Sequence, residues 1–177
     1  MEHGYDLDAA IRKVPDFPKP GILFYDITSV LMDTAAFGSC VDALVERYRG
    51  VELDAIAAIE SRGFLFAAPA ALELGLPLML VRKAGKLPGE TVSRTYELEY
   101  GTDTVEIHRD DLGTGKRVLI VDDLIATGGT VRATAELVAE SGGRVLEVWS
   151  VIGLPFLGYE ARLAPIGVHT LIDYEGE

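Results

Sequence analysis

Two adjacent aspartates and a loop of small residues stand together in the segment RVLIVDDLIATGGT, residues 117–130. The near-continuous apolar run predicts a buried strand, and Asp122 and Asp123 follow at its end. Carboxylates are costly to remove from water unless a partner binds them. The residues that come next carry little side chain that could pack in a core. The segment therefore predicts a site for a small, highly oxygenated anion.

The loop after the aspartates suits a phosphate group. It opens a predicted helix, whose first backbone N–H groups lack intrahelical partners and whose dipole is positive at that end. Glycines let the backbone approach closely, and threonine hydroxyls add donors. The aspartates would then accept hydrogen bonds from the vicinal hydroxyls of a sugar, so the predicted ligand is a ribose 5-phosphate. We expect its phosphate to be bound by Ala126, Thr127, Gly128, Gly129 and Thr130.

Other interpretations of the segment fit less well. A dinucleotide site requires G-x-G-x-x-G after a strand, but the nearest candidate, at 113–115, lacks the third glycine and precedes its strand. A P-loop requires a lysine after its last glycine, and none follows here. A phosphoacceptor receiver carries its acidic pair earlier, with more strands after it. A solvated strand end followed by a flexible turn stays open as the alternative without a ligand.

The rest of the chain alternates predicted strands and helices that would position this site. Residues 14–31, with three prolines and a glycine, are predicted as an ordered loop. The polar residues 83–94 are predicted to be mobile, and the alternation over 96–108 predicts a hairpin. Further strands are predicted at 54–60, 76–82, 116–123, 144–153 and 168–175, and helices at 6–13, 34–49, 63–75 and 130–143.

This order predicts an α/β fold with a mostly parallel twisted sheet and helices on both faces. In such folds ligands bind at the carboxyl ends of the strands, where the aspartates are expected to lie.

Composition limits the class of protein. The chain has 177 residues, of which 49% are hydrophobic and 25% charged, as in a single soluble domain with a substantial core. Its net charge of −12 argues against a nucleic-acid binder, which needs a basic face. No apolar run is long enough to span a membrane, and the N-terminus lacks a signal-peptide pattern. With one cysteine, Cys40, predicted as a buried thiol, a cytoplasmic location is expected.

The segment VLIVDDLIATGGT resembles the phosphoribosyl-diphosphate (PRPP) motif of the type I phosphoribosyltransferases. Four more segments, DFPKPGILFYDIT, ESRGFLFAAPAA, VRKAGKLPGET and YELEYGTDTVEIH, resemble in the same order the adenine-specific members of that family. The resemblance implies that the chain makes AMP and pyrophosphate from adenine and PRPP in purine salvage. It also implies Mg²⁺ held mainly by PRPP and water, a homodimer, and one domain, 1–177, with a hood at about 1–33 and a lid hairpin at about 83–108.

The resemblance assigns further roles to single residues. Glu99 would handle the proton of adenine with Tyr100 beside it, and the segment 83–100 would close over the ribosyl centre. The Glu60–Ser61 peptide would be cis. Pyrophosphate would be bound, partly across a dimer interface, by Arg62, Arg82, Lys83 and Lys86. Adenine would be bound by the backbone of Leu23 and Tyr25 and sandwiched by Phe24 and Leu154.

One position departs from the family pattern, because Tyr25 stands where an arginine is common. Backbone contacts survive this change, whereas any contact of the arginine side chain does not. Two other functions stay open: the same fold acting on hypoxanthine or xanthine, and a PRPP-sensing regulator of transcription. The adenine-type N-terminal segment argues against the first. A regulator would be expected to carry an added DNA-binding segment and to lack an intact lid pattern.

Overall fold

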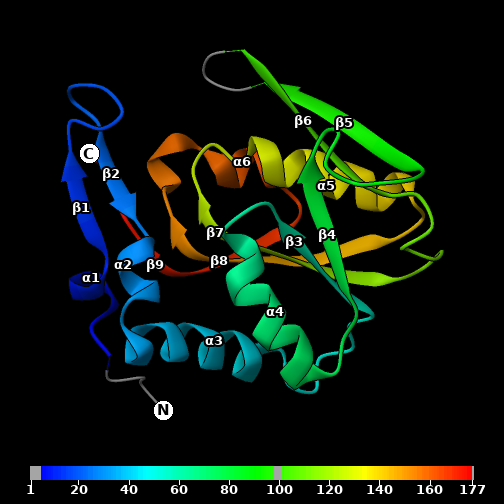
Figure 1. The fold of residues 1–177 in the computed structure, drawn as a ribbon, viewed down its shortest axis with the longest axis horizontal. Coiled ribbons are helices and arrows are strands. Elements are labelled where there is room, and N and C mark those ends of the chain that lie inside the picture. The colour runs from blue at the N-terminus through cyan, green and yellow to red at the C-terminus, as the bar shows by residue number, and fades with distance from the viewer. Residues whose placement is uncertain (1–4, 98–100, 177) are drawn as a thin grey trace.

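A computed structural model of the chain describes residues 5–97 and 101–176 (Figure 1). In this part of the chain seven strands form one sheet, in the order β5-β6-β4-β3-β7-β8-β9. The hairpin of β5 (Thr91–Glu97) and β6 (Thr102–His108) is antiparallel and joins the sheet beside β4. The parallel strands are β3 (Ala55–Ile59), β4 (Leu78–Lys83), β7 (Arg117–Ile125), β8 (Arg144–Gly153) and β9 (Gly167–Asp173).

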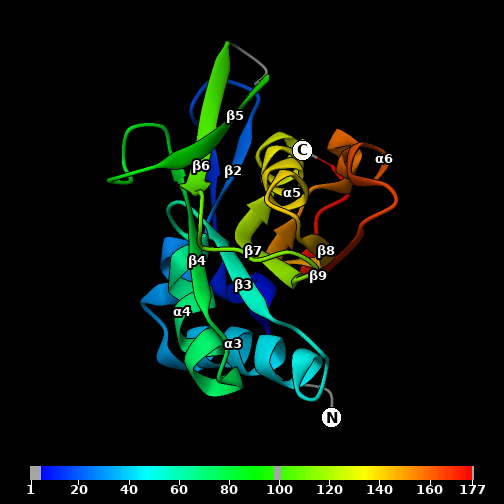
Figure 2. The same ribbon diagram turned by 90° about the vertical axis from the view of Figure 1, so that its right-hand side faces the viewer.

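Helices cover both faces of this sheet, as Figure 2 shows. On one face α3 (Thr34–Tyr48) and α4 (Gly63–Leu74) pack on one set of alternating strand residues, among them Ile56 and Leu119. On the other face α5 (Gly129–Glu140), α6 (Tyr159–Leu163) and the short 3₁₀ helix η1 (Pro155–Leu157) follow the later strands, and α5 packs on the intervening residues such as Ile120. The predicted α/β class, with a mostly parallel sheet, is confirmed.

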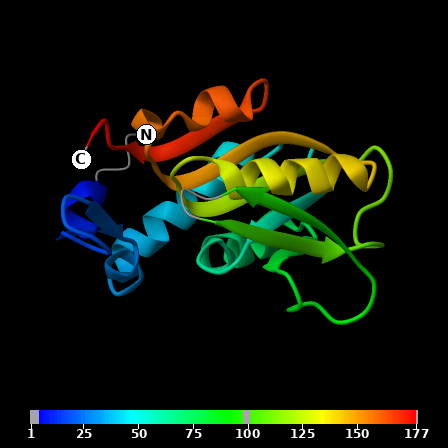
Figure 3. The same cartoon turned by 90° about the horizontal axis from the view of Figure 1, so that it is seen from above.

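The N-terminal segment forms a separate small unit. It consists of α1 (Leu7–Ala10), β1 (Arg12–Pro15), β2 (Leu23–Asp26) and α2 (Thr28–Leu31), and β1 and β2 pair only with each other in the described residues. Figure 3 shows this unit beside one end of the main sheet, close to the C-terminal segment.

The predicted helix over 6–13 is wrong beyond Ala10. Asp6 caps its first turn by accepting from the Ala9 N–H at 3.1 Å, but the chain then becomes extended and pairs with β2. Eight residues are too few for a helix to persist when a strand partner is available. The predicted loop over 14–31 is also wrong, because this segment contains β2, which pairs with β1, and α2.

Two other predicted boundaries are wrong. The strand that carries the aspartates continues to Ile125, because its ladder with β8 still pairs Leu124 with Ile152, so the aspartates lie inside β7 rather than after it. The first strand of the hairpin begins at Thr91, not at 96, because it pairs with β6 as far as His108.

Several other expectations are confirmed. Helix α4 ends at a glycine with positive φ, Gly75 at 67°, as predicted, and Cys40 is a fully buried thiol. No helix in the described residues has both the length and the apolar character needed to cross a bilayer.

Candidate active site

The carboxyl ends of β3, β4 and β7 open onto a cavity of about 450 Å³ that the β5–β6 hairpin covers on one side. Asp122, Leu124 and Thr130 line this cavity and also a second one of about 180 Å³ under the loop after β7. The two cavities are therefore adjacent. The larger is lined by Ile59, Glu60, Ser61, Arg62, Lys83, Tyr96, Asp103, Val105, Asp122, Asp123, Leu124 and Thr130.

The two aspartates are almost completely buried at the wall of this cavity. Asp122 is 8% exposed and Asp123 is 4% exposed. Asp123 accepts a hydrogen bond from the Arg62 guanidinium at 2.6 Å, and its own N–H donates to the Asp122 carboxyl at 2.9 Å. Burial, reinforced by the neighbouring Asp123 charge, raises the pKa of Asp122 well above its usual value. The protonated form that this favours can donate as well as accept a hydrogen bond.

A close approach between α4 and β7 places Arg62 beside Asp123. A Cβ on Gly63 would lie 2.8 Å from the Val121 carbonyl oxygen and 3.0 Å from the Asp122 Cα. Only glycine therefore allows α4 to begin at this position against the strand. The Glu60–Ser61 peptide that precedes it is cis, as the resemblance implied.

The loop after β7 encloses the smaller cavity, which is lined by Ala126, Thr127, Gly128, Gly129 and Thr130 together with neighbouring β7 and α5 residues. Gly128, with φ 76°, is the N-cap of the twelve-residue helix α5. A Cβ on Gly129 would lie 3.3 Å from the Glu97 carbonyl oxygen and the Tyr96 ring. The hairpin thus packs directly against the helix start. The structure brings together all the residues predicted to bind the phosphate.

Tyr96 and Asp103 line the larger cavity, although the sequence analysis did not assign them. The Thr130 hydroxyl donates to the Tyr96 hydroxyl at 3.0 Å, and Asp103 forms an ion pair of 3.0 Å with Lys83, which raises the pKa of that lysine. Tyr96 and Asp103 are cross-strand partners in the hairpin. The predicted hairpin over 96–108 contains both residues and could have indicated that they face each other.

The four basic residues predicted to bind pyrophosphate separate into two groups. Arg62 and Lys83 line the larger cavity, whereas Arg82 and Lys86 are absent from its described lining. Arg82 instead binds Glu60 at 3.2 Å and donates to the Lys86 carbonyl oxygen at 3.2 Å. Burial opposes the ionisation of Glu60, but the Lys83 N–H and the Arg82 guanidinium outweigh it and lower the pKa of Glu60.

The turn between β4 and β5 is held by a buried carboxylate that the sequence analysis also missed. Glu106, 5% exposed, accepts from the backbone N–H groups of Lys86 and Leu87 at 3.0 and 2.9 Å. These N–H groups, Leu87 first, lower the pKa of Glu106 despite its burial. The turn therefore has a defined anchor on β6, while the mobility predicted for 83–94 stays a prediction.

Three of the residues predicted to bind adenine, Leu23, Phe24 and Tyr25, lie on β2, and their side chains point to both of its sides. Phe24 lines a third cavity of about 450 Å³ with Val14, Phe17, Asp26 and Arg62. Leu23 and Tyr25 alternate with Phe24 and pack into the core, so their side chains face away from that cavity. Leu154 is not among its described lining residues. Instead Leu154 is buried, and its N–H donates to the Ile125 carbonyl at 2.9 Å, next to the phosphate loop. Glu99 and Tyr100 lie outside the described residues.

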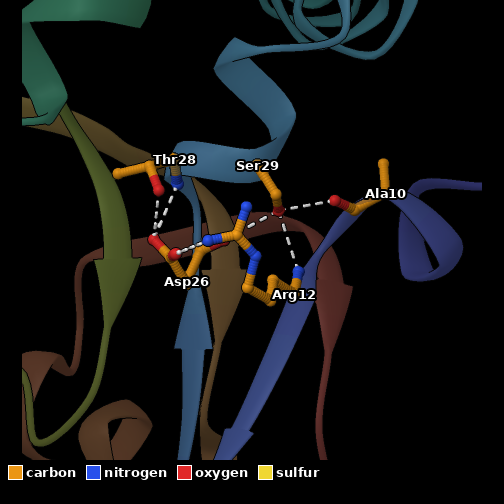
Figure 4. A network of polar contacts seen from close by, with 5 residues as sticks. All are labelled: Ala10, Arg12, Asp26, Thr28 and Ser29. Atoms are coloured by element: carbon orange, nitrogen blue, oxygen red, sulfur yellow. Dashed lines mark hydrogen bonds and ion pairs between the residues drawn. The ribbon is translucent and has the colours of Figure 1, made fainter.

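A polar network fixes β2 to its neighbours (Figure 4). Asp26 accepts from the Thr28 hydroxyl at 2.6 Å and from the Arg12 guanidinium at 3.2 Å. The Ser29 hydroxyl donates to the carbonyl oxygens of Ala10 and Asp26 and accepts from the Arg12 N–H. The Thr28 hydroxyl contributes most to the lowered pKa of Asp26. The network joins α1, β1, β2 and α2 around the strand that carries Phe24.

Comparison with known proteins identifies the family. Residues 33–155 match the family model of the phosphoribosyl transferase domain. An adenine phosphoribosyltransferase of Treponema denticola is 54% identical over 171 residues, which cover 97% of this chain and 90% of the relative. The chain belongs to the adenine phosphoribosyltransferases.

Solved structures of this family share the fold. The crystal structure of the adenine phosphoribosyltransferase from Thermoanaerobacter pseudethanolicus has a TM-score of 0.91 and 49% identity, and the match covers 95% of this chain and 98% of that one. The Saccharomyces cerevisiae enzyme, complexed with adenine and an imino-altritol 1,6-bisphosphate, has a TM-score of 0.88 and 43% identity, with 94% and 96% covered.

The carboxylates of the larger cavity are mostly paired with cations. Glu60 is paired with Arg82, Asp103 with Lys83 and Asp123 with Arg62. Within the described residues no group of three or more His, Cys, Asp or Glu side chains is arranged to hold a metal ion. With most of its carboxylates paired, this cavity offers few direct ligands, so a hard cation bound there would need water and substrate ligands of its own.

The aspartate pair makes a direct prediction. Asp123→Ala removes the acceptor of the Arg62 guanidinium and a predicted acceptor for the ribose hydroxyls, so PRPP affinity is expected to fall by about a hundredfold or more. Because the side chain lines a cavity, the far-UV circular dichroism should stay unchanged. Isothermal titration with PRPP and Mg²⁺ measures the loss, with Asp42→Ala on the exposed face of α3 as control. Unchanged PRPP affinity in Asp123→Ala would contradict the assignment.

The close approach at Gly63 makes a second prediction. Gly63→Ala forces α4 away from β7 and should cost about 1–3 kcal/mol of unfolding free energy, with weaker PRPP binding because Arg62 moves. The control is Gly38→Ala in α3, where a Cβ would meet nothing within 4 Å and helix propensity favours alanine. Thermal and urea denaturation of both variants check the difference. Equal stability of the two variants would show that the contact with Val121 does not constrain the site.

Proposed function

We propose that the chain transfers the 5-phosphoribosyl group of PRPP to adenine and so makes AMP and pyrophosphate in purine salvage. The observation that carries this proposal is a buried aspartate pair near the end of β7, two residues before the loop that opens α5, in a chain of this family. The fold alone would not decide the substrate, because one fold supports many activities. The high identity to adenine-specific relatives over nearly the whole chain supports adenine.

The two adjacent cavities suit the two ends of PRPP. The loop around the smaller cavity, Ala126, Thr127, Gly128, Gly129 and Thr130, binds the 5-phosphate, and Asp122 and Asp123 bind the ribose hydroxyls. Arg62 and Lys83, in the larger cavity, bind the diphosphate. The diphosphate competes with Asp123 and Asp103 for these two cations. Arg82 and Lys86 reach the same group only after the turn between β4 and β5 rearranges, or in a partner subunit.

The reaction requires positioning and charge stabilisation. The bond from C1′ to the diphosphate oxygen breaks, a bond from C1′ to N9 of adenine forms, and the N9 proton leaves the base. Positive charge develops on the ribose ring, and negative charge develops on the leaving diphosphate, where Arg62 and Lys83 stabilise it. Glu99 handles the proton of adenine, with Tyr100 beside it. The hairpin shields the centre from water as a lid at about 83–108.

Bound together with PRPP, Mg²⁺ would neutralise diphosphate charge and so assist the leaving group. The donor set of the cavity suits it, because Asp122 and Asp123 offer oxygen atoms that would contact its water ligands. Within one domain, 1–177, the hood at about 1–33 supplies the base site.

Adenine stacks on Phe24, with Leu154 on its other face. Phe24 lies in a cavity that it shares with Arg62, which links the base region to the diphosphate region. Leu23 and Tyr25 can contribute only backbone groups, because their side chains pack in the core. This arrangement tolerates Tyr25 in place of the usual arginine.

A direct assay tests the proposed function. Purified protein with Mg²⁺, PRPP and each purine base in turn is expected to form AMP from adenine and little nucleotide from hypoxanthine or xanthine, measured chromatographically. IMP or XMP as the main product would show that the substrate is hypoxanthine or xanthine rather than adenine. PRPP binding without any turnover would instead favour a PRPP-sensing regulator.

The proposed assembly is a homodimer and the proposed location is the cytoplasm, which the single cysteine, Cys40, supports. Helix α4 carries an exposed apolar stripe at Leu65, Ala68 and Leu72, spaced by three and four residues on one face. Leu72 is 85% exposed and Leu65 is 42% exposed. A second copy that covers this stripe would remove it from water and bring basic residues of one subunit toward the other.

The stripe gives a test of the assembly. Leu72→Glu places a charge in the proposed interface, so sedimentation velocity should show a dimer for the unchanged chain and a monomer for the variant. Glu73→Gln, at an exposed position beside it, is the control and should stay dimeric. A Leu72→Glu protein that sediments like the unchanged chain would place the interface elsewhere.

A further inference from the structure

Tyr174, directly after β9, contacts both sides of the region proposed to hold adenine. Its ring stacks on the ring of Tyr25 in β2, with centroids 3.9 Å apart and planes 14° from parallel. Its backbone N–H donates to the Gly153 carbonyl oxygen at the end of β8, at 3.0 Å. One residue therefore connects the N-terminal hairpin to the main sheet.

The side chain of Tyr174 is fixed by more than the stack. Its hydroxyl donates to Asp8 at 2.7 Å, and the Lys13 ammonium lies 5.4 Å from its ring centroid. Lys13 also binds the Asp8 carboxylate at 2.7 Å. Aromatic stacking, a charge-assisted hydrogen bond and a cation–π contact thus act on one ring. The orientation of this tyrosine is consequently well determined.

Two of the residues that Tyr174 contacts, Tyr25 and Gly153, each directly adjoin a residue whose side chain is proposed to stack on the base. On the hairpin, Tyr25 faces the core while its neighbour Phe24 faces the cavity. On the sheet, Gly153 immediately precedes Leu154, whose N–H donates to the Ile125 carbonyl at 2.9 Å. Because Phe24 and Tyr25 are adjacent in β2 and point to opposite faces, a displacement of Tyr25 would also move Phe24.

We propose that Tyr174 is a positioning residue for the base: it braces the β1–β2 hairpin against the end of β8 and so sets the separation of Phe24 and Leu154. The inference rests on the proposed adenine site and adds a residue that itself contacts no substrate. Tyr174 affects binding of the base, whereas the phosphate loop and the Arg62–Asp123 pair are held by other contacts.

The experiment compares substrate dependences in a graded series. Tyr174→Ala removes the stack and both polar contacts, and the KM for adenine is expected to rise about five- to tenfold, while the KM for PRPP changes less than twofold. Tyr174→Phe keeps the stack and loses only the Asp8 bond, so its KM for adenine should rise about twofold. The matched control is Tyr48→Phe, which loses a hydroxyl bond to Glu147 in a part of α3 away from the base region. Tyr48→Phe should leave both KM values unchanged.

The outcomes are distinguishable. Two results for Tyr174→Ala would overturn the proposal and leave Tyr174 a structural contact. One is an equal rise of the KM values for adenine and PRPP, and the other is a loss of stability with both KM values unchanged. If Tyr174→Ala does not fold, Tyr174→Phe tests the proposal instead. A KM for adenine in Tyr174→Phe equal to that in Tyr48→Phe would overturn the proposal. Failure of the unchanged chain to make AMP from adenine would instead reject the proposed function. Hydrogen exchange of the backbone amides of residues 23–26 tests the positioning role without an activity assay. The proposal predicts faster exchange in Tyr174→Phe than in Tyr48→Phe.

Discussion

Two carboxyl groups held out of water at the end of β7 are the constraint on which the site depends. A buried charge is costly unless it is paired, and Asp123 is paired with Arg62 while burial favours the protonated form of Asp122. This arrangement requires that the start of α4 lie against β7, which Gly63 alone permits. The same contact therefore positions the two acids proposed to bind ribose and one of the cations proposed to bind diphosphate.

Several residues proposed to bind the substrate are paired with other side chains. Arg62 is held by Asp123, Lys83 by Asp103, and the Thr130 hydroxyl by Tyr96. The proposed substrate would compete with these partners, so its binding would exchange one set of charge pairs for another rather than assemble a site from separated residues. Two of the internal partners, Tyr96 and Asp103, lie on the β5–β6 hairpin. Substrate binding and hairpin position are consequently linked through shared contacts.

Local patterns in the sequence predicted the parts of the fold that are governed by local physics. The helix over 34–49, the strand over 144–153 and the glycine that ends α4 follow from periodicity and conformational freedom. The β1–β2 pair and the extension of β7 to Ile125 did not follow, because a distant strand decides them. The sequence also did not predict that Arg82 would be absent from the described lining of the cavity that Lys83 lines. Arg82 is instead held by Glu60, a residue 22 positions earlier in the chain.

The central claim is that one helix start binds the phosphate of a nucleotide while Asp122 and Asp123 bind its ribose. A crystal structure of the protein with AMP tests this most directly. The account predicts phosphate oxygens within hydrogen-bond distance of the backbone N–H groups of residues 126–130, ribose hydroxyls on the two carboxyl groups, and the base beside Phe24. A nucleotide bound with its phosphate away from this loop, or with its ribose out of reach of both aspartates, would contradict it.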